Sequence, residues 1–461
     1  MLRQAQHERL LDSVSETNPI TLSPSKGAPF PLRVAITTLG CKVNQYDTAT
    51  IEDRLRTEGH TLVPFAETAD VYIVNSCTVT HQADAESRQL ARRAKRHNSS
   101  ARVIMTGCYA QVNPQSVARV PEVDYIIGLN RLDDLLRAVK AELAERVLVS
   151  NLRKAEHGQT PGIDTLGALT FSGQTRAFLK IQEGCDLFCT FCIVPMSRGK
   201  SRSVPPRSVF EQLDRLADQG FQEVVLTGIH LGGYGEDLDP RVNLTWLLEA
   251  IEERKPAPRV RLSSIDPHEI SDSLMRVLAQ AETLCPHLHI PLQSGDDTIL
   301  SRMRRRYDTA LARDVLTRLR ETLPHAALGT DLIVGFPGEG ETEFTRSLAF
   351  LEASPFTYFH VFPYSVRTGT TAAKFQDKVS QPIIDARARQ VRKLGEQKKV
   401  AFARRFVGQT LPVLFEHTRD KASSLLKGYS RNYLRVLATG RDAYMNREMP
   451  VTIIRTNGET L

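Results

Sequence analysis

The chain has 461 residues, of which 41% are hydrophobic and 25% charged, a composition typical of a folded protein with several domains. No run approaches the roughly 18 consecutive apolar residues of a membrane-spanning helix, and residues 1–30 lack the apolar core of a signal peptide. We therefore expect a cytoplasmic protein with a disordered tail over residues 1–30. The net charge of +7 suggests an anionic partner, although a basic surface that only aids solubility explains it equally well.

Three short apolar runs in residues 31–165 each end in a cysteine. RVAITTLGC ends at Cys41, ADVYIVNSC at Cys77 and ARVIMTGC at Cys108. Helix-like stretches follow, which predicts parallel strands in successive βα units of an α/β domain. Because ligands of open α/β sheets sit beyond the carboxyl ends of the strands, we expect the three cysteines to converge as one ligand set. The alternative is that each is a small buried hydrophobe.

A polar stretch, SNLRKAEHGQTPGIDTLGALTFSGQT, is a plausible linker to a second domain over residues 171–401. There, amphipathic helical stretches separate six strand-like runs: AFLKIQE, EVVLTGI, RVRLSSI, HLHIPLQ, LGTDLIVGF and YFHVFPYS. Six βα repeats predict a parallel sheet curled into an open (β/α)6 partial barrel, because each crossover returns right-handed over one face. Active sites of barrel folds lie at the carboxyl ends of the strands.

The loop after the first barrel strand, GCDLFCTFCIVP, holds Cys185, Cys189 and Cys192. In a reducing compartment such cysteines favour metal binding over disulfides. Structural zinc needs four protein ligands, and the loop offers no further Cys or His, although the distant His230 remains available. An iron-sulfur cube also has four corners, so three cysteines leave one iron open.

The C-x3-C-x2-C spacing after the first strand of a six-unit barrel resembles the radical S-adenosylmethionine (SAM) enzymes, in which SAM binds the open iron and is cleaved to a 5′-deoxyadenosyl radical. The domain order resembles the methylthiotransferase family over nearly all of residues 31–461. TLGCKVNQYDT is similar to members acting on threonylcarbamoyladenosine beside the tRNA anticodon, whereas relatives acting on isopentenyladenosine or a ribosomal protein carry GCQMN-like or GCPKN-like stretches. Further matching stretches are GCDLFCTFCIVPMSRGKSRS, RLSSIDP, HIPLQSG and TDLIVGFPGE.

This resemblance implies two [4Fe-4S] clusters. The SAM-cleaving cluster would be held by Cys185, Cys189 and Cys192, and an auxiliary, sulfur-carrying cluster by Cys41, Cys77 and Cys108. The reaction replaces the unactivated C2-H of adenine by S-CH3, with one SAM supplying the methyl group and a second the radical. The reducing electron donor, the sulfur source and the tRNA species are not identified by the sequence.

Seven residues, mostly at strand ends, are candidates for the SAM pocket. Phe191, Gly335 and Phe336 would contact the adenine, and Gly228 would let the chain pass close to the methionyl group. The ribose would be hydrogen-bonded by Ser263, Ser264 and Gln293. Each has a structural alternative, because Gly228 can form a turn, Phe336 can be core and the serines can cap a helix. Asp266 stands where relatives often carry Glu, and its role is open, as is that of Cys285.

Arg302, Arg304, Arg305 and Arg306 form the densest basic cluster, in SRMRRRYDT. We expect them at a helix start, where cations oppose the macrodipole and an anion, tRNA phosphate or the SAM carboxylate, would offset the cost. The alternative is a solvated face.

Residues 402–461 carry ten Lys or Arg against five Asp or Glu. After a basic helix, QPIIDARARQVRKLGEQKKVAFARRF, short alternating strands predict an OB-like β-barrel, a fold used for single-stranded nucleic acid. This tail resembles a TRAM RNA-binding domain. Tyr429, Tyr433, Arg431 and Arg435 are candidate stacking and phosphate groups, although core tyrosines explain the pattern almost as well.

The sequence thus predicts an enzyme that methylthiolates threonylcarbamoyladenosine in tRNA. Two alternatives with the same chemistry use isopentenyladenosine in tRNA or a ribosomal protein side chain as substrate. A third alternative, of a different class, is a non-catalytic iron-sulfur RNA-binding protein.

Overall fold

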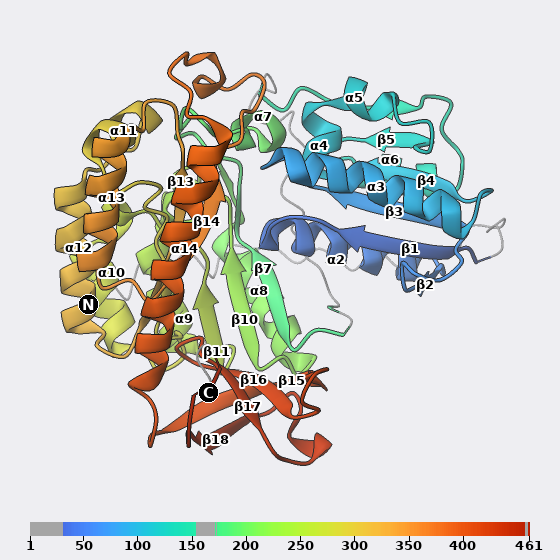
Figure 1. Cartoon of the computed structure of the whole chain (residues 1–461). Helices are drawn as coiled ribbons and strands as arrows, with labels where there is room; N and C mark the ends of the chain where they lie inside the picture. Colours follow the sequence, from blue (N-terminus) through green and yellow to red (C-terminus); the bar gives the residue numbers. More distant parts are fainter. Residues whose placement is uncertain (1–30, 154–170, 172, 457–459) are drawn as a thin grey trace.

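The computed structural model describes residues 31–153, 171, 173–456 and 460–461. Its amino-terminal unit is built on a fully parallel sheet in the order β2-β1-β3-β4-β5-β6 (Figure 1). The strands are β1 (Arg33–Thr38), β2 (Thr61–Val63), β3 (Val71–Ser76), β4 (Arg102–Thr106), β5 (Tyr125–Ile127) and β6 (Val147–Leu148). The helices are α2 (Lys42–Thr57), α3 (His81–His97), α4 (Gly107–Val112), α5 (Pro114–Ala118) and α6 (Leu132–Val139). One apolar core joins α3, α4 and α5 to the sheet and another joins α2 and α6. Helices therefore cover both faces, which explains the unbroken apolar runs of the strands.

The central unit is the expected barrel of six parallel strands (Figure 1). They are β7 (Arg176–Lys180), β10 (Glu223–Thr227), β11 (Arg259–Leu262), β12 (His287–His289), β13 (Ala327–Val334) and β14 (Tyr358–Pro363). Pairing follows chain order. Two isolated parallel bridges connect β11 to β12: Val260 of β11 pairs with Leu284 before β12, and Ser264 after β11 pairs with His289 of β12. Within the described residues β7 and β14 do not pair, so the barrel is open. The α/β fold and the (β/α)6 barrel predicted from the sequence are confirmed.

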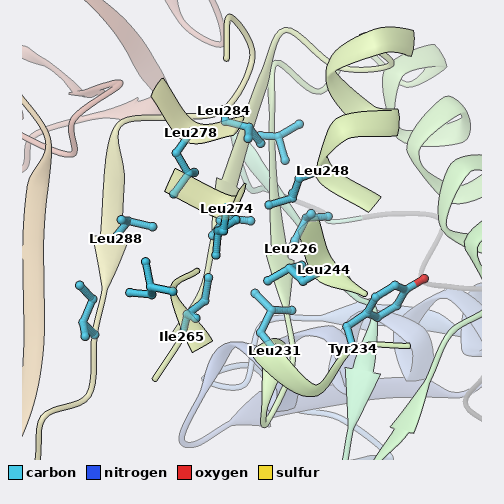
Figure 2. Close-up of a cluster of buried hydrophobic side chains, with 14 of the residues drawn as sticks. Leu226, Leu231, Tyr234, Leu244, Leu248, Ile265, Leu274, Leu278, Leu284 and Leu288 are labelled. Carbon is cyan, nitrogen blue, oxygen red and sulfur yellow. The ribbon is translucent and has the colours of Figure 1, made fainter. Parts of the chain in front are cut away.

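Helices surround the barrel on its outside (Figure 1). The longer ones are α8 (Pro206–Asp218), α9 (Leu244–Arg254), α10 (Asp272–Gln280), α12 (Thr309–Thr322), α13 (Glu341–Ala353) and α14 (Gln381–Arg404), and α7 (Val194–Arg198) and α11 (Asp297–Met303) are short. The 3-10 turns are η1 (Leu231–Gly233), η2 (Pro267–Glu269), η3 (Ala372–Lys374) and η4 (Asp442–Tyr444). Figure 2 shows part of the core that they bury, including Leu226 of β10, Leu248 of α9 and Leu274 of α10. In the described part of the chain, no helix combines the length and apolar character needed to cross a bilayer.

The carboxy-terminal unit is an antiparallel sheet in the order β17-β16-β15-β18, below the barrel in Figure 1. Its strands are β15 (Thr410–Arg419), β16 (Leu426–Ser430), β17 (Arg435–Ala438) and β18 (Glu448–Thr452), as the sequence predicted. The pairing of β15 with β16 shifts between Phe415 and Arg419, an irregularity that bends a strand. This arrangement is compatible with a TRAM-like domain.

Two of the residues proposed for RNA contact, Tyr433 and Arg431, dock this sheet onto the barrel. The ring of Tyr433 lies 4.6 Å from that of His287 and 4.8 Å from the Arg261 guanidinium. Arg431 pairs with Glu448 at 2.8 Å and donates to the Glu282 carbonyl at 2.7 Å. Tyr433 is therefore packed between the two domains, and Arg431 holds the sheet against the barrel.

The other two candidates are also engaged within the protein. The Tyr429 ring stacks on Tyr433 at 5.1 Å and lies 4.8 Å from the Arg176 guanidinium. Arg435 pairs with Asp420 at 2.5 Å, within its own sheet. The structure therefore gives all four candidates intramolecular contacts, and the core alternative describes the two tyrosines; RNA contact by the four residues stays a prediction.

Candidate iron-sulfur and SAM site

The C-x3-C-x2-C loop leaves the barrel directly after β7. Two short antiparallel strands, β8 (Gln182–Glu183) and β9 (Arg202–Ser203), hold its base. Gly184 has a φ of +73°, and a Cβ there would lie 1.9 Å from the Lys200 carbonyl oxygen, so the turn requires glycine. Thr190, inside the loop, donates its N–H to the Met303 carbonyl at 3.0 Å and its hydroxyl to the Arg302 carbonyl at 2.8 Å. The loop is therefore fixed from both its base and its centre.

The three thiols of this loop lie close together in one partly buried site. Burial raises the pKa of Cys185 and of Cys192 to about 12 each, and the neighbouring Cys189 contributes to both shifts. Buried thiolates close together repel one another, and a bound metal reverses that penalty because it stabilises the deprotonated ligand. Arg305 donates from Nη1 to Cys189 Sγ at 3.3 Å. The donor set therefore fits a cationic cluster.

A fourth protein ligand is missing among the described residues. The imidazole Nε2 of His230, the histidine considered for zinc, pairs with Glu269. The pKa of His230 is raised, because its hydrogen bond and ion pair with Glu269 outweigh the effect of burial. Three thiols without a fourth ligand suit an iron-sulfur cube with one open iron better than tetrahedral zinc.

The arginine cluster is not at a helix start, and that prediction is wrong. Asp296 accepts the N–H of Ile299 at 3.0 Å and starts α11 upstream, so that Arg302 falls in its last turn, where cations are favourable. Arg302 pairs with Asp377 at 2.7 Å. Arg305 pairs with Asp266 at 2.5 Å, with both side chains largely buried, so it does not face a tRNA phosphate. This pair gives Asp266 a role that the sequence left open.

The amino-terminal cysteines lie at the carboxyl ends of three adjacent strands. Cys41 follows β1 and caps α2, Cys77 follows β3, and Cys108 is in the first turn of α4 after β4. A Cβ at Gly40, whose φ is +97°, would lie 2.8 Å from Cys77 Sγ, so the chain passes very close to that thiol. Burial raises the pKa of Cys77 to about 12, and the proximity of Cys108 adds to it. The thiols are thus brought together as a ligand set requires.

Buried polar residues connect the two sets of cysteines. Arg198, in the last turn of α7, donates from Nη2 to Asn44 Oδ1 at 2.5 Å and to Asp47 Oδ2 at 2.8 Å. Its Nη1 pairs with Glu183, next to the loop of Cys185. Burial raises the pKa of Cys108, whereas the Arg198 charge lowers it. One guanidinium therefore lies beside the Cys108 thiol and holds the amino-terminal unit against the barrel.

A cavity of about 190 Å³ opens beside the barrel loop. Phe191, Cys192 and Gln293 line it, together with Asp331 and Tyr364. Two of the residues predicted for the SAM pocket are therefore beside a cluster cysteine. Within the described chain, the buried hydroxyl of Tyr364 has no hydrogen-bond partner. Sequence reasoning missed this residue, and an orphan hydroxyl of this kind is a candidate ligand contact.

The other predicted pocket residues differ in their surroundings. Ser263 Oγ is buried and has no partner within the described chain, as a ribose contact would require. Ser264 forms a bridge with His289. A Cβ at Gly228 would lie 2.9 Å from Gln182 Oε1, and one at Gly335 2.3 Å from the Ile384 side chain, so protein atoms crowd both glycines. Phe336 is fully buried in a small apolar core with Ile299, Met303 and Ala372, and it contacts Phe191 edge-on. Phe336 therefore packs as a core residue, and its contact with SAM stays a prediction.

Cys285 belongs to neither set. It is buried next to the barrel end that the carboxy-terminal sheet covers, and its N–H donates to the Val260 carbonyl at 2.8 Å. Burial raises the pKa of Cys285, so the group stays a protonated thiol, which is less reactive than a thiolate.

Replacing Gly184 by alanine is expected to disrupt the cluster loop, because the added Cβ meets the backbone oxygen of Lys200 and the φ is unfavourable for alanine. Iron content and the visible absorption of the reconstituted protein should fall. Gly220→Ala is the matched control: its φ is also positive, at +84°, but nothing lies within 4 Å of the added Cβ. It should cost only about 1 kcal/mol and retain iron. Equal iron content in the two variants would contradict the steric role of Gly184.

Comparison with known families and structures agrees with this architecture. Residues 33–128 match the Uncharacterized protein family UPF0004, and residues 179–351 match the Radical SAM superfamily. A solved structure, the radical S-adenosylmethionine methyltransferase TsrM from Kitasatospora setae with cobalamin and a [4Fe-4S] cluster bound, has a similar fold. Its TM-score is 0.54 at 15% identity, covering 72% of this chain and 75% of that one.

Curated relatives extend over most of the chain. The threonylcarbamoyladenosine tRNA methylthiotransferase MtaB of Bacillus subtilis is 40% identical, covering 92% of this chain and 94% of its own. MtaB of Aquifex aeolicus is 40% identical over 83% of this chain and 92% of its own. The tRNA-2-methylthio-N(6)-dimethylallyladenosine synthase of Clostridium botulinum is 30% identical, covering 92% of this chain and 95% of its own. The chain is thus a transferase that uses SAM and an iron-sulfur cluster, and it belongs to the radical SAM methylthiotransferase family.

Proposed function

We propose that this protein methylthiolates C2 of N6-threonylcarbamoyladenosine next to the anticodon of tRNA. The observation that carries the proposal is the 40% identity to the Bacillus subtilis MtaB over nearly the whole of both chains. The dimethylallyladenosine synthase that covers as much of the chain is only 30% identical. A tRNA substrate also suits the positive charge of the protein and a cytoplasmic location.

We further propose that the protein holds two [4Fe-4S] clusters. Cys185, Cys189 and Cys192 would bind one at the barrel mouth, and the cysteines that end β1, β3 and β4 would bind the auxiliary one. The barrel set offers one buried and two half-buried thiols, and the amino-terminal set two buried thiols and the exposed Cys41; a metal would relieve the mutual repulsion of their thiolates. When bound, the barrel cluster and SAM supply the radical that the inert C2-H bond of adenine requires.

The surrounding residues would set the charge on the cysteines and shape the space beside them. Arg305 donates to Cys189 and so withdraws charge from one thiolate, while Asp266 orients the guanidinium. Arg198 does the same for the amino-terminal set through its position beside Cys108. Phe191 and the hydroxyl of Tyr364 line the cavity beside Cys192, where they would shape the space for the adenosyl group and exclude water. The electron donor and the sulfur source would be supplied from outside the chain.

The test is anaerobic reconstitution with iron and sulfide, followed by reductant, SAM and tRNA bearing threonylcarbamoyladenosine, with mass spectrometry of the digested nucleosides. The expected product is the 2-methylthio derivative. Deoxyadenosine without that product would reject this substrate and direct the assay to isopentenyladenosine tRNA and then to ribosomal protein. Absence of deoxyadenosine from a protein with both clusters verified would favour a non-catalytic iron-sulfur protein.

A further inference from the structure

Three polar side chains meet on three neighbouring strands of the barrel. They are His289 of β12, Asp331 of β13 and His360 of β14. One oxygen of Asp331, Oδ1, lies 2.9 Å from His289 Nε2 and 3.1 Å from His360 Nδ1. In the part of the chain that the structure describes, no residue bonds to the other oxygen, Oδ2, or to His360 Nε2. The group therefore presents one free acceptor and one free imidazole nitrogen.

A second layer of residues fixes the orientation of this group. His289 Nδ1 lies 3.3 Å from the Tyr358 hydroxyl, which in turn lies 2.7 Å from His287 Nε2. The Tyr358 ring fits only because Gly329 has no side chain: a Cβ there would lie 2.0 Å from the ring. Such layered contacts are typical of side chains held ready for a ligand rather than of a solvated surface.

The group faces the place where the reaction would occur. Asp331 lines the cavity that also contacts Phe191 and Cys192. The His360 side chain is 54% exposed, whereas the His289 side chain is 8% exposed. Because β14 is the last strand of the open barrel, a substrate that enters at that edge would meet His360 first and Asp331 next.

Asp331 remains a carboxylate in this environment. Burial acts to raise its pKa, but hydrogen bonds from the two imidazoles lower it more, so that the net pKa lies well below the ordinary value. The Asp331 side chain is 27% exposed, so Oδ2 is open to solvent, and a ligand that covers it must donate an N–H in place of water. The exposed imidazole beside it suits an anionic group of the same ligand.

The threonylcarbamoyl group has both features. Its urea linkage carries N–H donors next to the adenine, and it ends in a carboxylate, whereas a dimethylallyl group offers only hydrocarbon beyond N6. On the basis of the function proposed above, we propose that Asp331 and His360 bind the threonylcarbamoyl group of the substrate nucleoside. Oδ2 of Asp331 accepts a urea N–H, and the Nε2–H of His360 donates to the terminal carboxylate.

This arrangement would also reject the wrong nucleoside. A site built to hydrogen-bond a substrate excludes analogues that lack those groups, because its own buried polar atoms are left unpaired. A dimethylallyl chain placed against Asp331 would leave the carboxylate without water or a donor.

The test compares two anticodon stem-loop RNAs that differ in one group. One bears threonylcarbamoyladenosine, and the other bears its methyl ester, which lacks the negative charge. For the wild-type holoenzyme we expect kcat/KM to be about 10- to 100-fold lower for the ester, as for the loss of a charged hydrogen bond. His360→Ala should react slowly and equally with both RNAs, while its cluster spectra remain those of the wild type.

Two further variants sharpen this comparison. His325→Ala removes another exposed histidine, beyond the amino-terminal end of β13, and should discriminate between the RNAs like the wild type. His360→Gln, which can place an amide N–H toward the carboxylate, should restore part of the lost rate. Unchanged discrimination in His360→Ala would overturn the inference and leave the proposed function intact. A wild type that forms no methylthio product from the unesterified RNA would overturn both.

Discussion

Cys189→Ala is expected to reduce SAM cleavage to the background rate. The loop supplies only three thiols, and within the described chain no neighbouring histidine or cysteine is placed to replace a lost one. Two remaining ligands would not hold a cube, so the open iron that binds SAM would be lost. Anaerobic reconstitution followed by quantification of deoxyadenosine measures this result directly.

Cys77→Ala should separate the two proposed clusters. This cysteine belongs to the amino-terminal set, so its loss should leave the barrel site loaded and SAM cleavage active but uncoupled, with no methylthio product. Cys285→Ala is the control, because it removes a buried cysteine that lies outside both sets and should preserve both activities. Equal loss of SAM cleavage in Cys77→Ala and Cys189→Ala would reject the division of labour between the sites.

The sequence predicted those features that depend on local pattern. Apolar runs followed by amphipathic stretches identified all six barrel strands, because both faces of a parallel sheet are buried. The same rule placed Cys41, Cys77 and Cys108 at strand ends, and parallel pairing of β1, β3 and β4 then brought those ends together. Neither inference requires knowledge of distant contacts.

Long-range ion pairs could not be read from the sequence in the same way. Arg305 is separated from Cys189 by 116 positions and Arg198 from Asn44 by 154. In the sequence these arginines are indistinguishable from solvated ones, since no spacing rule relates a guanidinium to a partner more than a hundred positions away. Composition suggested that arginines would meet RNA, whereas the structure shows that several of them join the domains.

The interface below the barrel illustrates the same limit. Glu223 lies 2.7 Å from both Arg259 Nη2 and Arg261 Nε, and all three side chains are buried. Arg259 also donates to the Ser430 carbonyl at 3.2 Å, and Arg261 to that of Arg431 at 2.9 Å. Charged residues at the start of strands read as surface positions until a following domain is known to cover them.

Arg198→Ala is expected to destabilise the junction of the amino-terminal unit and the barrel by about 3–5 kcal/mol, the cost of removing one partner from a buried ion pair. The side chain is only 1% exposed, and its loss would leave Glu183 and Asp47 without one of their cationic partners, although Lys180 still contacts both. Chemical denaturation and hydrogen exchange in α2 and α7 would measure the effect. Arg254→Ala, which removes a half-exposed ion pair with Asp214, is the control and should cost at most about 1 kcal/mol.

The same variant should also weaken selectively the metal site that we propose for the amino-terminal cysteines. Without the guanidinium, burial and the nearby Cys41 would raise the pKa of the Cys108 thiol further, with the Ser197 hydrogen bond still opposing them, so less thiolate would be available as a ligand at neutral pH. Iron should therefore be lost from the auxiliary site, and methylthio product with it, before SAM cleavage at the barrel declines. If Arg198→Ala and Arg254→Ala retained the same iron content and stability, the contacts of Arg198 would stabilise neither the domain junction nor the amino-terminal metal site.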